Sequence, residues 1–355
     1  MKTIIIPCAG KSSRFPNMKP KWMLTHPDGK LMIQKAIEGI NLEIFDKIII
    51  TILKEHILKY EADLILKQVF ENNKKVEICI LENSTKSASE TVYRTIDKMN
   101  INGSFIVKDS DNFVHVNLPV KPKNFIVGFD IHKHPKISNI PEKSFLIVNN
   151  QNITQDIIEK KIVSNIICLG IYGFENTIEF KKTFEYFLKN DIKNELFISH
   201  IISYIISQKK SIFEYIEAVD YKDWGTLNEW IAEQNKYRTY FIDVDGVIFK
   251  NSGKYGKINW LNNTEIINEN VREIIKLQES GGQIIITTSR SEEYRKNLEK
   301  ILLSLGIKPY SIIMGLNHSA RVLINDFAPT NPYPSGIAIS LPRDSLIKDY
   351  IKVDK

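Results

Sequence analysis

The feature that most constrains this chain is a strand–turn unit that occurs twice. Each copy begins with a short apolar run, rich in β-branched residues, and continues into a turn of small and polar residues. The copies are residues 3–6 followed by 7–15, and residues 239–242 followed by 243–247. Buried strands that end in such turns are typical of parallel α/β units.

Further apolar runs alternate with amphipathic stretches along the chain, which is the pattern of an α/β protein. We expect a Rossmann-like first domain with a mixed, mostly parallel sheet, and a smaller doubly wound second domain without a large cap. The expected strands are residues 47–53, 76–81, 104–108, 124–129, 144–149, 166–174, 240–242, 283–287 and 322–324. The expected helices are residues 31–38, 89–100, 195–207, 266–280 and 292–305.

The length of 355 residues is sufficient for two domains. A polar segment, residues 232–238, comes directly before the second strand–turn unit. We place the domain boundary there, so that the expected domains are residues 1–236 and 237–355.

Composition excludes several classes of protein. The 48 Lys and Arg exceed the 42 Asp and Glu by only six charges, without a long basic block, so we expect no nucleic-acid partner. No apolar run approaches the roughly 20 residues of a membrane span, and the first apolar run is too short for a signal peptide. The three cysteines (Cys8, Cys79 and Cys168) fit neither a disulfide framework nor a zinc motif. We therefore expect reduced thiols in a cytoplasmic protein.

The turn after the first strand combines small residues with basic ones. Backbone N–H groups in such a turn can hold phosphate oxygens, and Arg14 and Lys21 add the positive charge that a triphosphate requires. A basic turn is also a common solvated surface, so this loop alone does not establish a site. The loop residues that we expect to contact phosphate are Ala9, Gly10, Lys11, Ser12 and Ser13.

Two later segments carry carboxylates. Asp109 and Asp111 follow the expected strand at residues 104–108, and Asp223 lies in a tight turn far downstream. Carboxylates together with phosphate oxygens are the usual ligands of Mg²⁺. The simpler interpretation of each residue is a turn or helix-capping aspartate.

Taken in order, these segments resemble the sugar-nucleotidyltransferase family. Its members carry an Ala-Gly-x-x-x-Arg loop, a Pro-Lys pair, a metal-binding aspartate at a strand end and a late Asp-x-Gly-Thr. The chain departs from the family at Ser12, where glycine is frequent. The matching residues are Ala9-Gly10 with Arg14, Pro20-Lys21, Asp111, and Asp223-Trp224-Gly225-Thr226.

The resemblance implies a reaction in which a substrate phosphate oxygen attacks the α-phosphorus of a nucleoside triphosphate and pyrophosphate leaves. Catalysis of such a step is mostly positioning and charge neutralisation. The resemblance assigns triphosphate contacts to Gly10, Arg14 and Lys21. It assigns Mg²⁺ to Asp111 and Asp223.

The resemblance also suggests where the rest of the substrates bind. Segment 85–91 resembles the part that contacts the base and ribose, through Thr85, Ser87 and Ser89. Glu159 and Lys160 resemble a Glu-Lys pair that contacts the small phosphorylated acceptor.

The second strand–turn unit predicts another site. Asp243 and Asp245 follow one expected strand, while Thr288-Ser289 and Asp326 follow two others. Parallel strands present their carboxyl ends at one edge, so these residues can converge. Asp243 could then attack a phosphoryl group and Asp245 could move the proton, with Thr288 and Ser289 on the phosphate and Mg²⁺ on Asp243 and Asp326. An isolated Asp-x-Asp-Gly is more simply a turn.

Residues 238–350 resemble the haloacid-dehalogenase-like phosphatase superfamily. The superfamily's lysine, which neutralises nucleophile and phosphate, is missing, because residues 315–318 read Gly-Leu-Asn-His. Arg321 and Lys308 are the alternative sources of that charge, although neither is at the expected place. The roughly forty residues between the first two motifs leave no room for a large cap.

Together the resemblances imply a bifunctional enzyme of the kind found in bacterial capsule or surface-polysaccharide precursor synthesis, with CTP as the favoured donor and Mg²⁺ as the cofactor. Two alternatives stay open. The second domain could be a binding module without phosphatase activity, or the first could be a metal-dependent glycosyltransferase, since those enzymes also use Asp-x-Asp. The loop at residues 10–14 with Pro20-Lys21 argues against a glycosyltransferase, because a diphosphate donor needs no triphosphate clamp.

Overall fold

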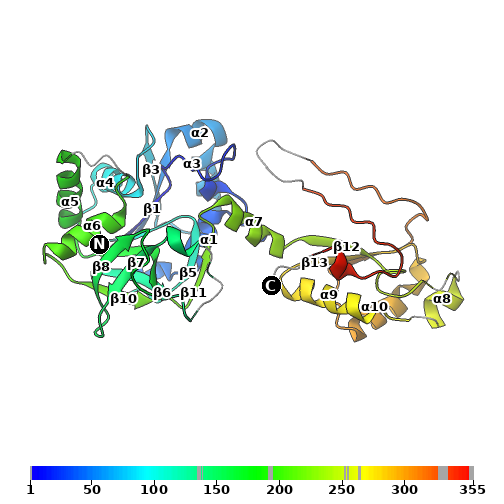
Figure 1. The fold of residues 1–355 in the computed structure, drawn as a ribbon. Helices are drawn as coiled ribbons and strands as arrows, with labels where there is room; N and C mark the ends of the chain where they lie inside the picture. The colour runs from blue at the N-terminus through cyan, green and yellow to red at the C-terminus, as the bar shows by residue number, and fades with distance from the viewer. Residues whose placement is uncertain are drawn as a thin grey trace. The chain divides into compact units, whose positions relative to one another are not determined.

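The structure is a computed structural model, and it describes the chain except residues 1, 134–136, 138, 191–194, 252, 254–255, 263–264, 327–334 and 352–355. The chain divides into two compact units, Met1–Trp230 and Ile231–Lys355 (Figure 1). The division falls within helix α7 (Leu227–Lys236), whose last residue is the predicted boundary. None of the described helices is long and apolar enough to cross a membrane.

The first unit is built on a nine-stranded sheet with the order β3-β2-β1-β4-β9-β6-β10-β8-β7. Parallel pairs join β3, β2, β1 and β4, and a further one joins β6 to β10. The sheet is mixed as predicted, but it is not mostly parallel, because β9 runs antiparallel to β4, β6 and β7, and β8 runs antiparallel to β7 and β10. The strands are β1 (Lys2–Pro7), β2 (Lys47–Leu53), β3 (Val76–Leu81), β4 (Ser104–Lys108), β6 (Phe125–Asp130), β7 (Ser144–Val148), β8 (Ile153–Glu159), β9 (Ile166–Phe174) and β10 (Phe213–Glu217).

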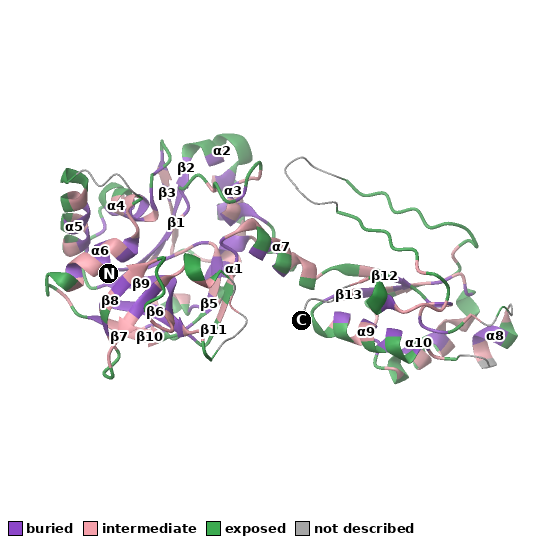
Figure 2. Ribbon diagram, in the orientation of Figure 1, coloured by how far each residue is buried: buried purple, intermediate pink, exposed green. Residues whose placement is uncertain are grey.

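Helices cover both faces of this sheet, as the central strand β1 illustrates. Ile4 and Ile6 pack in the core formed with α1 and α3, whereas Ile5 packs in the core formed with α4, α5 and α6. Alternate side chains of a strand point to opposite faces, so a strand buried on both sides is a continuous apolar run. Figure 2 shows this central part of the sheet as buried. The helices are α1 (Met32–Glu38), α2 (Lys54–Tyr60), α3 (Ala62–Val69), α4 (Ala88–Lys98), α5 (Thr177–Lys189) and α6 (Ile198–Ser207), with short 3₁₀ turns η1 (Lys21–Met23), η2 (Leu42–Ile44) and η3 (Ile140–Glu142).

A separate two-stranded ladder also belongs to the first unit. Strand β5 (Asn112–His115) pairs antiparallel with β11 (Asp220–Asp223), and Asp223 lies opposite Asn112. The sequence analysis did not predict this ladder, because it placed Asp111 at a strand end and Asp223 in a tight turn. It joins two parts of the chain that are far apart in the sequence.

The second unit contains three parallel strands in the order β12-β13-β14. Each strand of this sheet is added on the same side of the one before it in the sequence. Right-handed crossovers therefore place both connecting helices, α9 and α10, on one face of the sheet, where both contribute to a single core (Figure 1). Phe241, on the other face, is 55% exposed, so the doubly wound arrangement that we predicted is not present in the described part. The elements are β12 (Thr239–Asp243), α8 (Lys257–Asn262), α9 (Asn268–Glu279), β13 (Gln283–Thr287), η4 (Glu292–Tyr294), α10 (Arg295–Ser304), β14 (Ser311–Ile313) and η5 (Ile347–Asp349).

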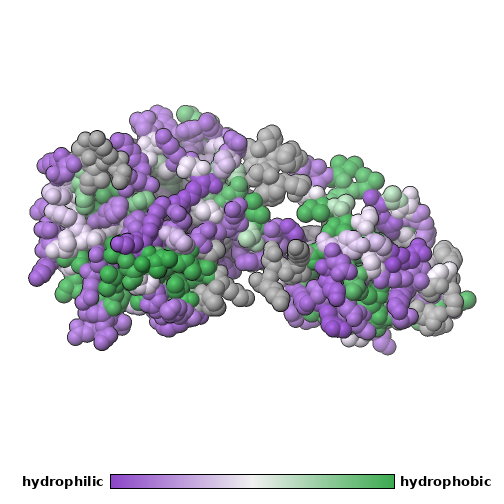
Figure 3. Space-filling model, viewed as in Figure 1, coloured by the Kyte–Doolittle hydropathy of each residue, from purple (hydrophilic) through white to green (hydrophobic). Residues whose placement is uncertain are grey.

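The prediction of a strand at residues 322–324 is wrong. The third strand of the sheet is β14, while Val322 and Ile324 are 80% and 91% exposed. This segment runs beside another extended segment, where the Asn325 amide donates to the Ser335 carbonyl at 3.0 Å. Figure 3 shows apolar side chains at the surface there. A β-favouring sequence forms a strand only where a sheet edge pairs with it, and no described strand does so.

Candidate functional site

The loop after β1 turns sharply at Ser12, whose φ of 51° lies in the left-handed region. The Ser12 carbonyl accepts from the Phe15 amide at 2.8 Å, and its hydroxyl accepts from the Lys21 amide at 3.3 Å. Glycine adopts this conformation at least cost, whereas Ser12 is held in it by these two hydrogen bonds. A Cβ built on Gly10 would meet no atom within 4 Å, so this part of the loop faces open space. Ala9 is buried, Ser12 is half-buried, and Lys11, Ser13 and Arg14 are exposed.

The β5–β11 ladder brings Asp111 and Asp223 together. Beyond the last paired residues, the Trp224 amide donates to the Asp111 carbonyl at 2.9 Å, which continues the ladder. A Cβ built on Gly225 would lie 3.1 Å from Asp223 Oδ1 and 3.5 Å from Asp111 Oδ2. Two carboxylates from distant parts of the sequence therefore lie beside the same glycine.

Each of these carboxylates has a lysine ammonium next to it. Lys21 Nζ lies 2.5 Å from Asp111 Oδ2, and Lys143 Nζ contacts Asp223 Oδ2. The Asp111 and Asp223 side chains are only 15% and 11% exposed. Burial raises the pKa of Asp111, but Lys21, Lys108 and Lys143 lower it more, and the result lies below the ordinary value.

The pair of carboxylates fits a Mg²⁺ ion. Mg²⁺ in proteins keeps several waters and is usually bound through one or two carboxylates together with substrate phosphates. The two lysine ammoniums already show that positive charge is favourable at both carboxylates. No group of three or more His, Cys, Asp or Glu that could hold a metal occurs among the described residues. Asp111 and Asp223 would therefore hold the ion jointly with phosphate oxygens.

A buried lysine supports the turn that carries Asp111. Lys108 is fully buried and donates to the carbonyl oxygens of Asp109 at 2.6 Å and Asn112 at 3.0 Å. These acceptors satisfy a charge that would otherwise be costly to bury. Burial lowers the pKa of Lys108 to about 8.

The neighbouring Asp109 packs against the backbone of β9. Its amide donates to the Gly170 carbonyl at 2.9 Å, and a Cβ built on Gly170 would lie 2.1 Å from Asp109 Oδ2. Burial, with a contribution from Asp111, raises the pKa of Asp109 to about 7. Asp109 thus has a different environment from Asp111, two residues away on the same turn.

Segment 85–91 lies against the loop at residues 9–14, where the Thr85 amide donates to the Ala9 carbonyl at 3.3 Å. The hydroxyl groups of this segment form hydrogen bonds with other groups of the protein. Ser87 is the N-cap of α4, and the fully buried Ser89 donates to the Leu196 carbonyl at 2.5 Å. The side chains of Ser87 and Ser89 therefore position this segment, and Ser89 is not accessible to a ligand.

Glu159 and Lys160 lie where β8 ends. The Glu159 carboxylate accepts from the hydroxyls of Ser144 at 2.5 Å and Ser199 at 2.6 Å, which fixes its orientation. Lys160 has a left-handed backbone, and its amide donates to the Lys143 carbonyl at 3.1 Å. The sequence analysis missed Lys143, because no motif marks a single lysine in the turn between η3 and β7.

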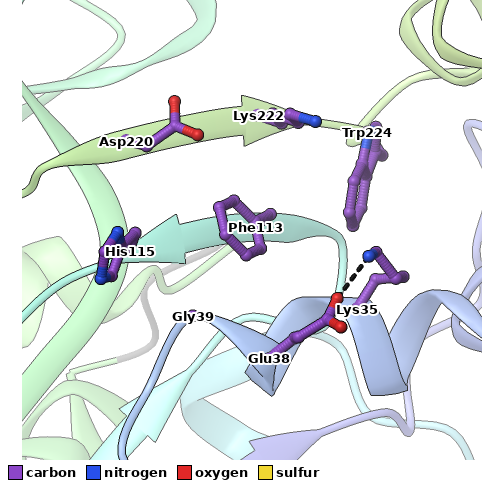
Figure 4. Close-up of a pocket in the computed structure, with 8 residues that line it drawn as sticks. All are labelled: Lys35, Glu38, Gly39, Phe113, His115, Asp220, Lys222 and Trp224. Atoms are coloured by element: carbon purple, nitrogen blue, oxygen red, sulfur yellow. Dashed lines mark hydrogen bonds and ion pairs between the residues drawn. The ribbon is translucent and has the colours of Figure 1, made fainter. Parts of the chain in front are cut away.

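A pocket of about 310 Å³ lies on the opposite face of the β5–β11 ladder (Figure 4). Alternate side chains of a strand point to opposite faces, so Asp220 and Lys222 line this pocket while Asp223 does not. The other residues around it are Lys35, Glu38, Gly39, Phe113, His115 and Trp224. The pocket is therefore separate from the carboxylates of the candidate site.

In the second unit, Asp243 ends β12 and Asp245 follows it. Both Asp245 oxygens accept from Arg290, from Nε at 2.9 Å and from Nη2 at 2.7 Å. Arg290 is only 2% exposed and lies over the Phe249 ring. The residue that we predicted to move a proton is thus held in a bidentate ion pair.

The other residues predicted for this site do not all lie at the ends of the strands next to Asp243. Thr288 is buried and its hydroxyl accepts from the Arg290 amide at 3.1 Å, whereas the Ser289 hydroxyl accepts from Arg321 at 3.1 Å. Asp326 is exposed and follows no strand, because residues 322–324 form none, and no described contact joins it to Asp243. Lys308 precedes β14 and so lies at the opposite edge of the sheet from Asp243. Of the two alternative cations, Arg321 is therefore the one at the correct edge.

Comparison with known proteins shows the fold of the first unit. No protein-family model matches the sequence, and no curated protein matches it. A nucleoside-diphosphate-sugar pyrophosphorylase from Vibrio cholerae RC9 matches with a TM-score of 0.55 and 19% identity, over 65% of this chain and 99% of its own. A UDP-glucose pyrophosphorylase complexed with UDP-glucose matches with a TM-score of 0.51 and 16% identity, over 66% of this chain and 97% of its own. The first two-thirds of the chain therefore has a nucleotidyltransferase-like α/β fold.

Proposed function

We propose that the first unit is a Mg²⁺-dependent nucleotidyltransferase. It transfers a nucleotidyl group from a nucleoside triphosphate to a sugar phosphate, polyol phosphate or similar small phosphate and releases pyrophosphate. The observation that carries this proposal is the convergence of Asp111 and Asp223 next to Lys21, which the loop at residues 9–14 holds in place. The likeness in fold to two pyrophosphorylases supports it.

The reaction follows from the charges in the site. An acceptor phosphate oxygen forms a bond to the α-phosphorus, and the bond from that phosphorus to the bridging oxygen breaks, so that pyrophosphate leaves with the electron pair. Arg14, Lys21 and the backbone of the loop stabilise the charge of the triphosphate. Asp111 and Asp223 would hold Mg²⁺, which supplies charge neutralisation on the phosphates when it is bound.

The acceptor and the base are assigned by position and resemblance. Glu159 and Lys160 are proposed to contact the acceptor, with Glu159 oriented by two serine hydroxyls. Segment 85–91 is proposed to contact the base and ribose through Thr85 and the backbone. CTP as the donor, and a role in capsule or surface-polysaccharide precursor synthesis in the cytoplasm, are further parts of the proposal.

For the second unit we propose a haloacid-dehalogenase-like phosphatase site at the carboxyl edge of the β12–β13 pair. Asp243 and Ser289 lie at adjacent strand ends, and Arg321 reaches Ser289. Both oxygens of Asp245 are engaged by Arg290, and this favours the alternative in which the second unit binds a ligand without catalysing a reaction. The Asp243→Asn variant decides between them: loss of phosphate release with unchanged nucleotidyl transfer supports the phosphatase.

The first unit is tested by incubating the full chain with each of the four nucleoside triphosphates and a panel of sugar and polyol phosphates, with Mg²⁺. We expect pyrophosphate from one combination and none after chelation of Mg²⁺ by EDTA. Absence of pyrophosphate with every combination would favour the glycosyltransferase alternative.

A further inference from the structure

Lys143 is a cation of the candidate site that no motif identifies. It lies between η3 and β7, at the turn where its carbonyl accepts from the Lys160 amide. Its side chain is 14% exposed, although lysine is rarely buried without a partner. This position is next to the proposed acceptor contacts and reaches the proposed metal carboxylates.

The Lys143 ammonium is held by the ladder that forms the site. Nζ contacts Asp223 Oδ2, lies 3.3 Å from the Tyr221 hydroxyl and lies 5.7 Å from the centre of the Tyr221 ring. Tyr221 and Asp223 are on the same face of β11, so one strand supplies both partners. Asp223 Oδ1 accepts from the Gly225 amide at 2.9 Å, so Oδ2, which the Lys143 ammonium contacts, is the oxygen of this carboxylate that would be left for a metal ion.

Two cations cannot occupy one carboxylate oxygen in a largely buried site without strong repulsion. A divalent ion that binds Asp223 must therefore displace the Lys143 ammonium. Arg14, Asp111 and Glu229 all lie close enough to act on the charge of Lys143. Arg14 is one of the residues that we propose to contact the triphosphate, so the displaced ammonium stays near the proposed position of the substrate phosphates.

We propose that Lys143 holds Asp223 in the metal-free protein and moves from it to a substrate phosphate oxygen when the divalent cation binds. The second half of this proposal rests on the proposed nucleotidyl transfer, whereas the first half concerns the metal alone. The nearness of Lys143 to the Lys160 turn favours the acceptor phosphate as its partner. In this arrangement the site carries no unpaired buried carboxylate before the cation arrives.

The test measures Mn²⁺ binding to the full chain without nucleotide, by electron paramagnetic resonance of the free ion. The Lys143→Met variant should bind Mn²⁺ about tenfold more tightly than the natural chain, because the competing ammonium is removed and all molecules are competent to bind. Lys143→Arg keeps a positive charge and should bind as weakly as the natural chain. Unchanged or weaker binding by Lys143→Met, in protein whose circular dichroism is native, would overturn the first half.

The matched control is Lys123→Met, which removes another lysine paired with a carboxylate, that of Glu214, but with a side chain that is 39% exposed. Its Mn²⁺ affinity should be unchanged, and an equal gain there would overturn the proposal. Inorganic phosphate tests the second half. Phosphate should tighten Mn²⁺ binding to the natural chain more than to Lys143→Met, because only the natural chain has the released ammonium. Equal tightening overturns that half, whether or not the chain transfers nucleotides.

Discussion

The two units place aspartates after a parallel strand in the same way and differ in what reaches those aspartates. In the first unit, Asp111 follows β4, and the β5–β11 ladder adds Asp223 from far along the chain. In the second unit, Asp243 and Asp245 follow β12, but Arg290 engages Asp245 and Asp326 is not delivered by a strand. A strand–turn motif therefore predicts where one carboxylate lies, and the pairing of remote segments decides whether a second joins it.

The cations that pair with these aspartates also differ between the two units. Lys21 and Lys143 meet their carboxylates from separate segments, as single ammoniums on flexible stems. Arg290 meets Asp245 with a planar fork and is almost completely buried. The first arrangement allows a cation to replace the lysines, whereas the second fixes one geometry.

The largest expected effect is the loss of nucleotidyl transfer in Asp223→Asn. Removing one of two carboxylates that would hold Mg²⁺ should lower kcat/KM at least about a thousandfold, since metal contacts stabilise the transition-state charge by several kcal/mol. Pyrophosphate release measures it. Asp220→Asn is the matched control, because Asp220 lies on the same strand and faces the opposite side. A similar loss in both variants would show that the ladder, and not the carboxylate, matters.

The next effect concerns the stability of the second unit. Arg290→Met leaves the carboxylate of Asp245 without its partner and should destabilise this unit by about 3 kcal/mol. Thermal unfolding should show its transition shifted downward and that of the first unit unchanged. Arg295→Met removes surface ion pairs with Glu292 and Glu299 and a hydrogen bond to the Ile312 carbonyl, and it should destabilise the unit much less, because ion pairs in contact with solvent contribute little. Equal costs for the two arginines would remove the contrast between the units.

Some strands of this protein can be predicted from the sequence and others cannot. The bounds of β2, β4 and β9 agree with the prediction, because strands buried on both faces are continuous apolar runs with turn residues at their ends. The half-buried edge strand β3 also has the predicted bounds. The β5–β11 ladder could not be predicted, since its strands are four residues each and rich in polar residues. Residues 322–324 were wrongly predicted as a strand, because their β propensity is high but no strand of the described sheet pairs with them.

The candidate site shows the same limit at the level of single residues. The motifs place Lys21, Asp111 and Asp223 in one site, but nothing in the sequence marks Lys143. Ser89 was predicted as a ligand contact because of its hydroxyl, although it is buried and bonded to the backbone of residue 196. Local composition indicates which residues can bind a phosphate. It does not indicate which of them form hydrogen bonds within the folded protein instead.

A smaller effect is expected from Gly170→Ala. Gly170 has a φ of +69°, and a Cβ there would lie 2.1 Å from Asp109 Oδ2. The variant should destabilise the first unit by about 2–3 kcal/mol, measured by urea unfolding, from backbone strain together with displacement of Asp109. Gly315→Ala, in the second unit, has the same φ and no neighbour within 4 Å, so it should show the strain of about 1 kcal/mol alone. Equal values would indicate that Asp109 moves freely.

Asp109 should make the stability of the first unit depend on pH. The pKa of Asp109 is about 7 in the folded protein, above its ordinary value of 3.8, so the folded state binds a proton that the unfolded state releases. The stabilisation is complete below pH 3.8 and is lost as the pH rises through 7. Asp109→Asn should flatten this dependence, and stability measured between pH 5 and 8 checks it. A variant that keeps the natural slope would assign the dependence to another group.

The most direct test of the account is phosphorus NMR of the products formed by the full chain with Mg²⁺, its preferred nucleoside triphosphate and its acceptor phosphate. If Asp111 and Asp223 serve nucleotidyl transfer, pyrophosphate and a new diphosphate linkage should appear in equal amounts, and neither should appear with Asp223→Asn. Release of inorganic phosphate or of a nucleoside diphosphate in place of pyrophosphate, or full activity of Asp223→Asn, would contradict the account.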